Sequence, residues 1–213
     1  MKPAQVVALF ERFRAANPEP RSELEYTTPF ELLVAVVLSA QATDAGVNKA
    51  TRRLFATANT PQALLDLGED RLREAIASIG LYKTKARNII AACRILVEQY
   101  GSAVPHDRQA LESLPGVGRK TANVVLNVAF GEDTIAVDTH IFRVANRLGL
   151  ARGKTPAEVE AGLEKAIPAQ FRHHAHHWLV LHGRYVCKAR KPECWRCGVA
   201  DLCPFRPKTP APR

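Results

Sequence analysis

The sequence predicts an all-α protein of 213 residues. Apolar residues recur with the 3.6-residue period of amphipathic helices, and no segment shows the competing two-residue period of strands. Two segments, Thr28-Pro29-Phe30-Glu31 and Thr155-Pro156-Ala157-Glu158, have the form of capping boxes with proline at the first helical position. Glycines end several of the periodic segments, as at Gly101, Gly131 and Gly149.

Each expected helix has a local signal for its start or its end. The valine-rich run 32–38 alone would suggest a strand, but the capping box before it identifies a buried helix. Asp44, Asp107 and Asp138 stand where they can cap helices. The expected helices are a first one with an apolar stripe over residues 6–13 that ends near 17, then 29–38, 44–57, a short segment from 61, 69–78, 84–100, 108–113, 119–130, 139–148, a segment from 156 and 168–186.

The net charge of +9 favours a polyanionic partner. From residue 183 onward the sequence contains eight basic residues and two acidic ones, a local net charge of +6. The basic residues are interleaved with cysteines. No apolar run approaches the length of a membrane span, and no signal region opens the chain. We therefore expect a cytoplasmic protein that has no membrane partner.

The segment Leu114-Pro115-Gly116-Val117-Gly118-Arg119-Lys120 predicts a turn leading into a helix. Glycine allows close approach of a ligand, and the amides of a helix N-terminus attract anions. With Arg119 and Lys120 beside them, these amides indicate a site for a nucleic-acid phosphate. The alternative is an ordinary αα-hairpin whose lysine is merely solvated.

Four of the five cysteines, Cys187, Cys194, Cys197 and Cys203, fall within 17 residues in the spacing C-x6-C-x2-C-x5-C. In a cytosolic chain such a group favours a metal over disulfides. Only one C-x2-C pair is present, so the spacing favours a [4Fe–4S] cluster over zinc, with unpaired thiols as the weakest alternative.

The remaining cysteine and the clustered histidines are expected to be structural. Cys93 lies in an apolar helix pattern and is interpreted as a buried thiol. The histidines have no further ligand at matching spacing, so ordinary helix faces are favoured over a metal site. They are His173, His174, His176 and His177.

Taken together, these pieces resemble the endonuclease III family of DNA glycosylases, in the helix-hairpin-helix superfamily. The resemblance spans residues 28–203. Its matching segments are Ser39-Ala40-Gln41-Ala42-Thr43-Asp44, Ile79-Gly80-Leu81-Tyr82, the glycine turn through Ala122, Val137-Asp138-Thr139-His140, His182-Gly183-Arg184 and the cysteine loop.

The resemblance implies a two-domain fold. Residues 22–132 would form a six-helix barrel domain that contains the helix-hairpin-helix. Residues 1–21 and 133–213 would form an iron–sulfur domain with the cluster loop at 187–203. DNA would bind between the two, with the hairpin facing Asp138.

The family's catalytic pair matches Lys120 and Asp138. Lys120 would attack C1′ of a damaged nucleotide, expel the base and cleave the strand by β-elimination, a base-excision reaction on duplex DNA that carries a damaged pyrimidine or an abasic site. The neutral amine that this step needs would be favoured by burial and by the helix N-terminus. Asp138 would stabilise charge on the sugar or relay a proton. The structural alternatives are an N-cap for Asp138 and a phosphate contact for Lys120.

The family's DNA contacts match further positions. Gln41 would fill the space left by the flipped base and Leu81 would wedge the stack. Without the resemblance, Leu81 would be assigned to the core and Gln41 to a polar helix end. Phosphate contacts are expected from Gly116, Val117, Gly118, Arg119, Arg184, Lys188, Arg190 and Lys191. The enzyme is expected to act as a monomer.

Two other functions compete with this one. A mispaired-adenine glycosylase of the same superfamily would lack the catalytic lysine and would carry an extra C-terminal domain, whereas Lys120 is present and the chain ends soon after Cys203. A non-catalytic DNA-binding module would need neither Lys120 nor Asp138.

Overall fold

The computed structural model describes residues 1–212, and every regular element within that range is helical. The all-α prediction is confirmed. In the described range no helix is both long enough and apolar enough to cross a membrane. The elements are α1 (Pro3–Ala16), α2 (Pro29–Ser39), α3 (Asp44–Phe55), α4 (Pro61–Leu67), α5 (Glu69–Ala75), α6 (Tyr82–Tyr100), α7 (Arg108–Ser113), α8 (Arg119–Phe130), α9 (Thr139–Leu148), α10 (Pro156–Ala166), α11 (Ala169–Tyr185) and the 3-10 turn η1 (Cys194–Arg196).

Helix starts follow the predicted caps with one correction. Asp107 accepts a hydrogen bond from Ala110 N at 2.8 Å, as the sequence predicts. The cap of α3 is Thr43, whose hydroxyl accepts from Gly46 N at 3.2 Å, and Asp44 is instead the first helical residue. Threonine and aspartate both cap well, so two adjacent candidates leave the choice to the path of the preceding chain.

Several helix boundaries also differ from the prediction by a few residues, two of them at functionally placed turns or core positions. The α6 helix begins at Tyr82, two residues before the expected start, because Leu81 in a left-handed conformation supplies the cap. The α5 helix ends at Ala75 rather than near residue 78, and Ile76 and Ile79 continue into the core through a turn.

In both capping boxes the glutamate accepts its hydrogen bond from the residue before the N-cap, not from the N-cap residue itself. Thr28 caps α2 and accepts from Glu31 N at 3.1 Å. The Glu31 carboxylate accepts not from Thr28 N but from Thr27, through its amide at 2.5 Å and its hydroxyl at 2.7 Å. In the second box, Glu158 likewise accepts from Lys154 N at 2.7 Å. Each glutamate thus ties down one more residue before the helix.

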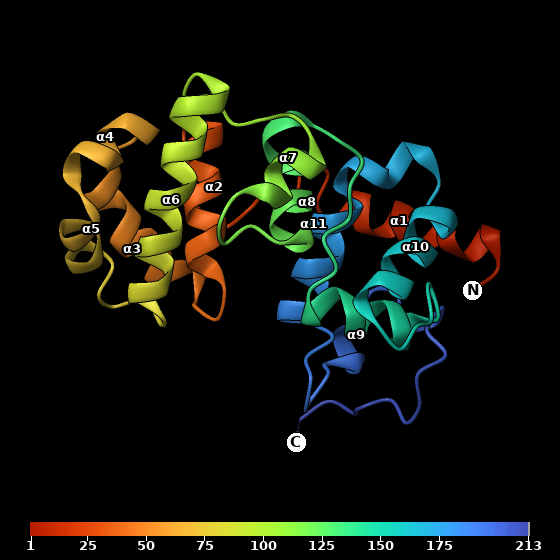
Figure 1. The fold of residues 1–213 in the computed structure, drawn as a ribbon. Helices are drawn as coiled ribbons and strands as arrows, with labels where there is room; N and C mark the ends of the chain where they lie inside the picture. Colours follow the sequence, from red (N-terminus) through yellow and green to blue (C-terminus); the bar gives the residue numbers. More distant parts are fainter. Residues whose placement is uncertain (213) are drawn as a thin grey trace. The chain divides into compact units, whose positions relative to one another are not determined.

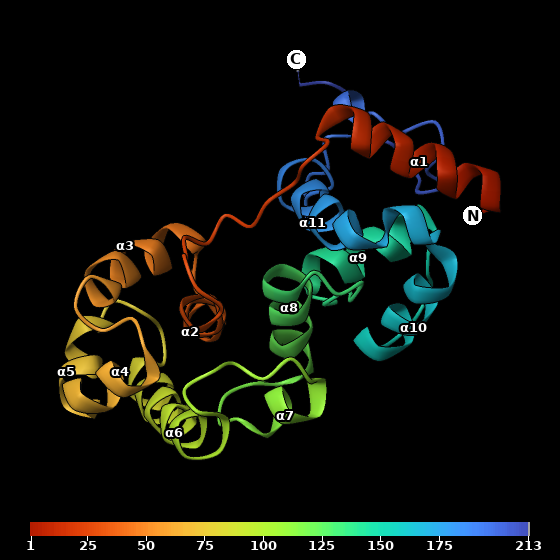
Figure 2. The same ribbon diagram turned by 90° about the horizontal axis from the view of Figure 1, so that it is seen from above.

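The chain divides into two compact units, residues 22–132 and residues 1–21 with 133–213. In the first unit α6 packs against α2, α4 and α5, and α8 packs against α2 and α7 (Figures 1 and 2). Every residue of α2 from Phe30 to Leu38 is buried, so the valine-rich run is a core helix as predicted. Cys93 is also buried in this core, and burial raises the pKa of its thiol to about 12.

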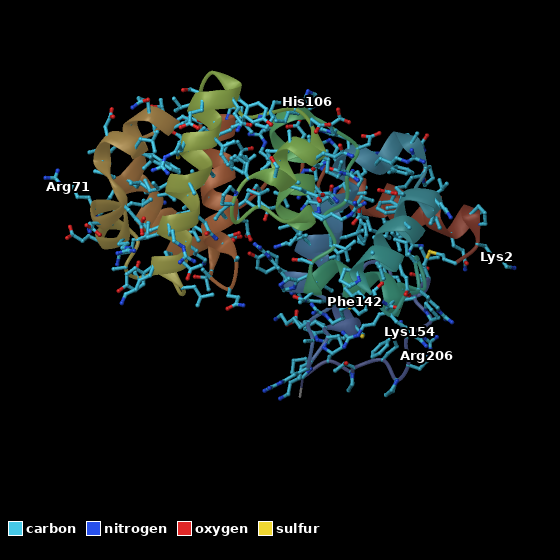
Figure 3. The ribbon with its side chains drawn as sticks, viewed as in Figure 1. Lys2, Arg71, His106, Phe142, Lys154 and Arg206 are labelled. Atoms are coloured by element: carbon cyan, nitrogen blue, oxygen red, sulfur yellow. The ribbon has the colours of Figure 1, made fainter. Side chains whose placement is uncertain are left out.

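The second unit packs α1 and α9 against α11, with α10 against α9. Phe10 stacks on Phe171 with ring centroids 5.5 Å apart, and both are buried among the apolar side chains of α9 to α11. Trp178 donates its indole N–H to Asn17 O at 2.8 Å, which fixes the end of α1. Basic side chains project from the surfaces of both units, Arg71 from one and Lys2 from the other (Figure 3).

Candidate functional site

The glycine turn joins α7 to α8 within the unit 22–132. Val117 N donates to Leu114 O at 3.0 Å, and the buried Val117 side chain anchors the turn to the core. Gly116 has φ +84°, and a Cβ there would lie 3.1 Å from the side chain of Asn88 on α6. A residue with a side chain would therefore be strained in its backbone and crowded against Asn88. The turn holds its backbone at the surface, because Gly118 is exposed and a Cβ there would meet nothing.

The N-terminus of α8 has no side-chain cap. Among the described helices, six begin at a threonine or an aspartate whose side chain accepts a hydrogen bond from the first turn. The α8 helix begins after Gly118, which has no side chain to accept one. The first turn therefore presents backbone donors and the positive end of the helix dipole to a ligand, with Arg119 and Lys120 exposed beside them.

Lys120 is exposed in the described chain, whereas burial was one of the two features expected to favour its neutral form. Its position explains the difference. Lys120 is the second residue of α8 and lies at the surface end of the helix, whereas Ala122, Val125 and Leu126 face the core.

Asp138 begins α9 in the other unit and caps it, as the structural alternative anticipated. Its Oδ1 accepts from Ile141 N at 2.8 Å, and its side chain is half-buried. In the described residues the second carboxylate oxygen has no hydrogen-bond partner. The charge of Asp138 reaches Arg143, where it raises the pKa of the guanidinium while burial, the larger effect, lowers it. A capping role and a free oxygen thus coexist in one carboxylate.

Gln41 and Leu81 lie on neighbouring turns of the unit 22–132. Both residues are exposed and both have positive φ, +57° for Gln41 and +59° for Leu81. Leu81 is 62% exposed, which excludes the core position that the sequence alone would give it. The turns are in contact, because a Cβ on Gly80 would lie 3.8 Å from Gln41 O. Strained non-glycine backbone of this kind concentrates at functional sites.

Lys85 is a polar residue at this place that the sequence analysis did not identify. It is 6% exposed, and its ammonium donates to Leu38 O at 2.8 Å and to Ala40 O at 2.6 Å. A signal was available, because Lys85 falls in register with the buried Ile89 and Leu96 on the apolar face of α6. A lysine at a core position needs a buried partner.

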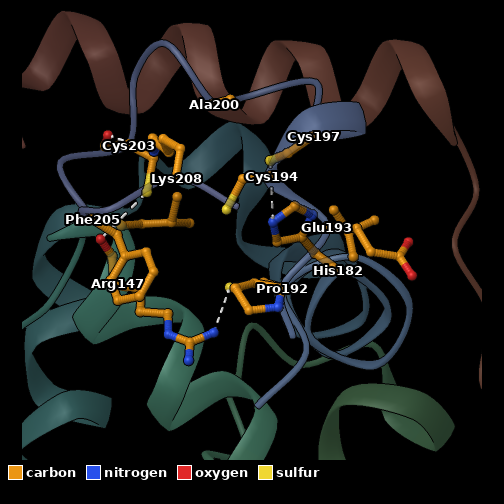
Figure 4. A pocket seen from close by; sticks show the side chains of 13 residues that line it. Arg147, His182, Pro192, Glu193, Cys194, Cys197, Ala200, Cys203, Phe205 and Lys208 are labelled. Carbon is orange, nitrogen blue, oxygen red and sulfur yellow. Dashed lines mark hydrogen bonds between the residues drawn. The ribbon is translucent and has the colours of Figure 1, made fainter. Parts of the chain in front are cut away.

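The four cysteines are free thiols that line one cavity of about 330 Å³, part of it open to solvent (Figure 4). Burial raises the pKa of the Cys197 thiol, and its sulfur lies 3.8 Å from Nε2 of His182. Arg147 Nη1 lies 3.5 Å from Cys187 Sγ, a donor suited to a ligated sulfur. In the described chain no three His, Cys, Asp or Glu side chains meet as ligands for a single metal ion. Four thiols around one cavity fit an iron–sulfur cluster as a donor set.

The basic loop 188–193 leaves the cysteine cavity between Cys187 and Cys194. Lys188 forms an ion pair with Glu193 at 2.5 Å, so it is less available to phosphates than expected. Arg190 and Lys191 are exposed and form no ion pair in the described residues. Arg147 holds the start of the loop by donating to Lys188 O at 2.7 Å and to Ala189 O at 2.8 Å.

Arg184 is half-buried near the end of α11, whereas the histidine cluster at 173–177 lies nearer the start of the same helix. Burial lowers the pKa of His177 to about 4, with smaller contributions from His174 and His173. A neutral, largely buried His177 suits the structural interpretation of this cluster.

Comparison with known proteins matches both the glycine turn and the cysteine loop. A family model described as "HhH-GPD superfamily base excision DNA repair protein" covers residues 34–169. A second, the "iron-sulfur binding domain of endonuclease III", covers residues 187–203. Endonuclease III of Haemophilus influenzae and that of Escherichia coli K12 are each 58% identical over 208 residues, 98% of this chain and 99% of theirs. Endonuclease III of Treponema pallidum is 60% identical over 198 residues, 93% of this chain and 94% of its own.

Comparison with solved structures identifies the same family. A trapped endonuclease III–DNA covalent intermediate aligns with a TM-score of 0.90 at 47% identity, over 96% of each chain. A non-covalent endonuclease III–DNA complex aligns equally well, at 46% identity. A thermostable thymine-DNA glycosylase, at 23% identity and a TM-score of 0.81, shares the fold.

Proposed function

Because this chain belongs to the endonuclease III family of DNA glycosylase/AP lyases, within the HhH-GPD base excision repair superfamily, we propose that Lys120 is the nucleophile of its reaction. The substrate is double-stranded DNA with a damaged pyrimidine or an abasic site, and the enzyme acts on it as a monomer in the cytoplasm, at the nucleoid. Relatives solved with DNA, one of them covalently trapped, support both the partner and covalent catalysis.

The uncapped start of α8 is the observation that carries this proposal. The backbone donors of its first turn, which no N-cap side chain engages, bind a phosphate of the DNA backbone, and Lys120 extends from the second position of the same helix. A phosphate held there places the adjacent deoxyribose within reach of a lysine side chain. An αα-hairpin with a purely structural turn would need no exposed amine at that position.

The reaction then follows from the amine. A damaged base is out of reach inside the duplex, so the nucleotide is flipped out first. The lone pair of Lys120 Nζ forms a bond to C1′ as the glycosidic bond breaks, and the base leaves with that bonding pair and takes up a proton. Loss of a proton from the amine and opening of the sugar give an imine between Nζ and C1′. The imine acidifies the C2′ proton, and its removal expels the 3′ phosphate by β-elimination.

Asp138 assists through the carboxylate oxygen that capping leaves free. One oxygen is engaged by Ile141 N, which orients the group. The other is free to stabilise positive charge on the sugar or to carry the proton released by Lys120. Asp138 is thus both an N-cap and a catalytic group.

Gln41 and Leu81 enter the duplex while the base is outside it. Both side chains are already exposed on adjoining turns, so insertion exposes no core. Leu81 replaces the stacking lost on one side of the gap and Gln41 offers hydrogen bonds within it. Unstacking is costly, and such insertions compensate part of that cost.

The chain carries a [4Fe–4S] cluster, and we assign Cys187, Cys194, Cys197 and Cys203 as its ligands. Bound there, the cluster supplies a rigid cross-link between the end of α11 and the loop. Arg147 fixes the first carbonyls of the basic loop, so Arg190 and Lys191 are presented to the phosphates as a preformed pair of cations. Arg184 and Lys188 contribute charge behind them.

Borohydride trapping tests this function. Wild-type protein should form a covalent adduct on a duplex containing thymine glycol and on one containing an abasic site, and none on undamaged DNA. Lys120→Gln should still bind but form no adduct, since an amide cannot form the imine. Lys83→Gln is the matched control, because Lys83 is also an exposed lysine at the second position of a helix. An adduct in the Lys120→Gln protein, or an active wild type that forms none, would overturn the proposal.

A further inference from the structure

The buried ammonium of Lys85 joins two segments that are far apart in the sequence. Its Nζ donates to Leu38 O, in the last turn of α2, and to Ala40 O, just beyond the helix. Lys85 itself lies in the first turn of α6, 45 residues from Ala40. The contact is therefore tertiary, and it joins residues next to the turns of Gln41 and Leu81.

Lys85 supplies hydrogen-bond donors to carbonyl groups at the C-terminal end of α2. The last carbonyls of a helix lack partners within the helix and carry the negative end of its dipole. The last turn of α2 contains no basic residue of its own. Ser39 Oγ donates to Val36 O at 2.9 Å and Ala42 N donates to Ser39 O at 3.0 Å, while Lys85 supplies the donors for Leu38 O and Ala40 O.

Lys85 contacts the residue before Gln41 through its side chain and Leu81 through its backbone amide. Ala40, whose carbonyl it binds, immediately precedes Gln41. Its own amide donates to Leu81 O at 3.0 Å. Both flanked residues have left-handed backbone, a conformation that a non-glycine residue keeps only when its surroundings hold it. The Lys85 ammonium thus ties the segment that carries Gln41 to the first turn of α6, the helix that Leu81 caps.

We propose that Lys85 is a positioning residue for base extrusion, which holds Gln41 and Leu81 in register so that they enter the duplex as a pair. The inference rests on the proposed function, in which these two side chains insert into DNA. Lys85 itself touches no substrate. Its effect is confined to steps in which a stacked base must leave the helix.

Lys85→Met tests the proposal, since methionine retains length and apolar bulk but cannot donate to either carbonyl. Lys83→Met is the matched control: it removes the same charge from the same helical turn, and Lys83 is exposed and contacts neither carbonyl. The probe is a duplex in which 2-aminopurine lies beside thymine glycol. The fluorescence of 2-aminopurine rises when the neighbouring base unstacks. A second duplex carries an abasic site in place of thymine glycol.

Lys85→Met should lower the rate of fluorescence rise and of thymine glycol excision on the order of tenfold to a hundredfold, the size expected when a working group is misplaced by about 1 Å. Cleavage of the abasic duplex should change much less, because no damaged base has to leave the stack. Lys85→Arg, which keeps donors and charge, should recover part of the loss. Lys83→Met should behave as wild type in both assays.

A double-mutant cycle separates positioning from general damage to the fold. If Lys85 acts through Leu81 and Gln41, adding Lys85→Met to the Gln41→Ala/Leu81→Ala double variant should cost little further excision. A full additional loss would overturn the proposal, as would wild-type extrusion by Lys85→Met. Excision unaffected by Leu81→Ala would instead count against insertion itself, and so against the proposed function.

Hydrogen exchange provides a readout if Lys85→Met folds poorly. Lys85→Gln keeps an amide donor group but loses the charge and some length, so it should loosen the amides of residues 39–43 and 79–82 selectively, while the rest of α6 keeps its protection. Protection of both turns equal to wild type in Lys85→Gln, together with normal extrusion, would show that the contact does not position them.

Discussion

The Leu81→Gly variant should be at least as stable to unfolding as the Leu81→Ala variant. Both substitutions should impair base extrusion. In most positions glycine is the more destabilising of the two residues. The opposite order is expected here because Leu81 has φ +59° and caps α6 from the left-handed region.

The structure gives the expected size of each effect. Truncating a core leucine costs about 2–5 kcal/mol, but Leu81 is 62% exposed. Less than half of the roughly 1.5–3 kcal/mol gained by full burial is then lost, or about 1 kcal/mol. Left-handed backbone costs a non-glycine residue about 1–2 kcal/mol, a cost that Leu81→Ala retains and Leu81→Gly removes. The added backbone entropy of glycine offsets about 0.5–1 kcal/mol of that gain.

Urea unfolding measures the stabilities, and single-turnover excision measures the function. Both variants should lie within about 1 kcal/mol of wild type, with the glycine variant at least as stable as the alanine variant. Both should excise thymine glycol slowly and cleave abasic DNA nearly normally. A loss of about 2–5 kcal/mol in Leu81→Ala, or a glycine variant clearly less stable than the alanine variant, would refute the assignment of Leu81 as a strained, exposed wedge.

Three further predictions concern the cluster, the basic loop and a buried histidine. Anaerobically purified protein should contain about four irons per chain by elemental analysis, with broad absorbance at the blue edge of the visible range; stoichiometric zinc without iron would contradict the cluster assignment. Lys191→Ala should reduce the salt dependence of DNA affinity by about one unit of slope in binding titrations, and an unchanged slope would remove Lys191 from the phosphate contacts. Burial lowers the pKa of His177 from 6.5 to about 4, so the unfolded chain binds the proton more readily, and stability is lost as the pH is lowered from 6.5 towards 4. At about 1.4 kcal/mol per pH unit the loss approaches roughly 3 kcal/mol, and His177→Gln should flatten the urea-unfolding curve in that window; an unchanged pH dependence would contradict a buried, neutral His177.

Features with a local cause were predictable from the sequence. The cap of α2 by Thr28, the start of α8 after Gly118 and the cap of α9 by Asp138 each depend on a few adjacent residues. The burial of α2 followed from the same logic, because the capping box identified the helix and its apolar residues on every side then required a core position.

Features set by tertiary contacts were missed or mistaken. In the sequence, Lys85 is not distinguished from the other basic residues of an amphipathic helix. The structure shows its ammonium donating to a carbonyl at the end of α2. Lys188 was expected as a free cation, but the loop folds back and pairs it with Glu193. Burial was expected to favour the neutral form of Lys120, yet the place of this residue at the surface end of α8 leaves it exposed. In each case the outcome depends on what the rest of the chain brings near the side chain.

The most direct test of the central claim is to locate the covalent bond itself. Wild-type protein is trapped with borohydride on duplex containing thymine glycol, digested with protease and nuclease, and mapped by mass spectrometry. The deoxyribose remnant should be found on the peptide containing Lys120 and on no other lysine or the N-terminus. Asp138→Asn should give the same site at a much lower rate. A remnant at any other amine in the wild-type protein would contradict the mechanism.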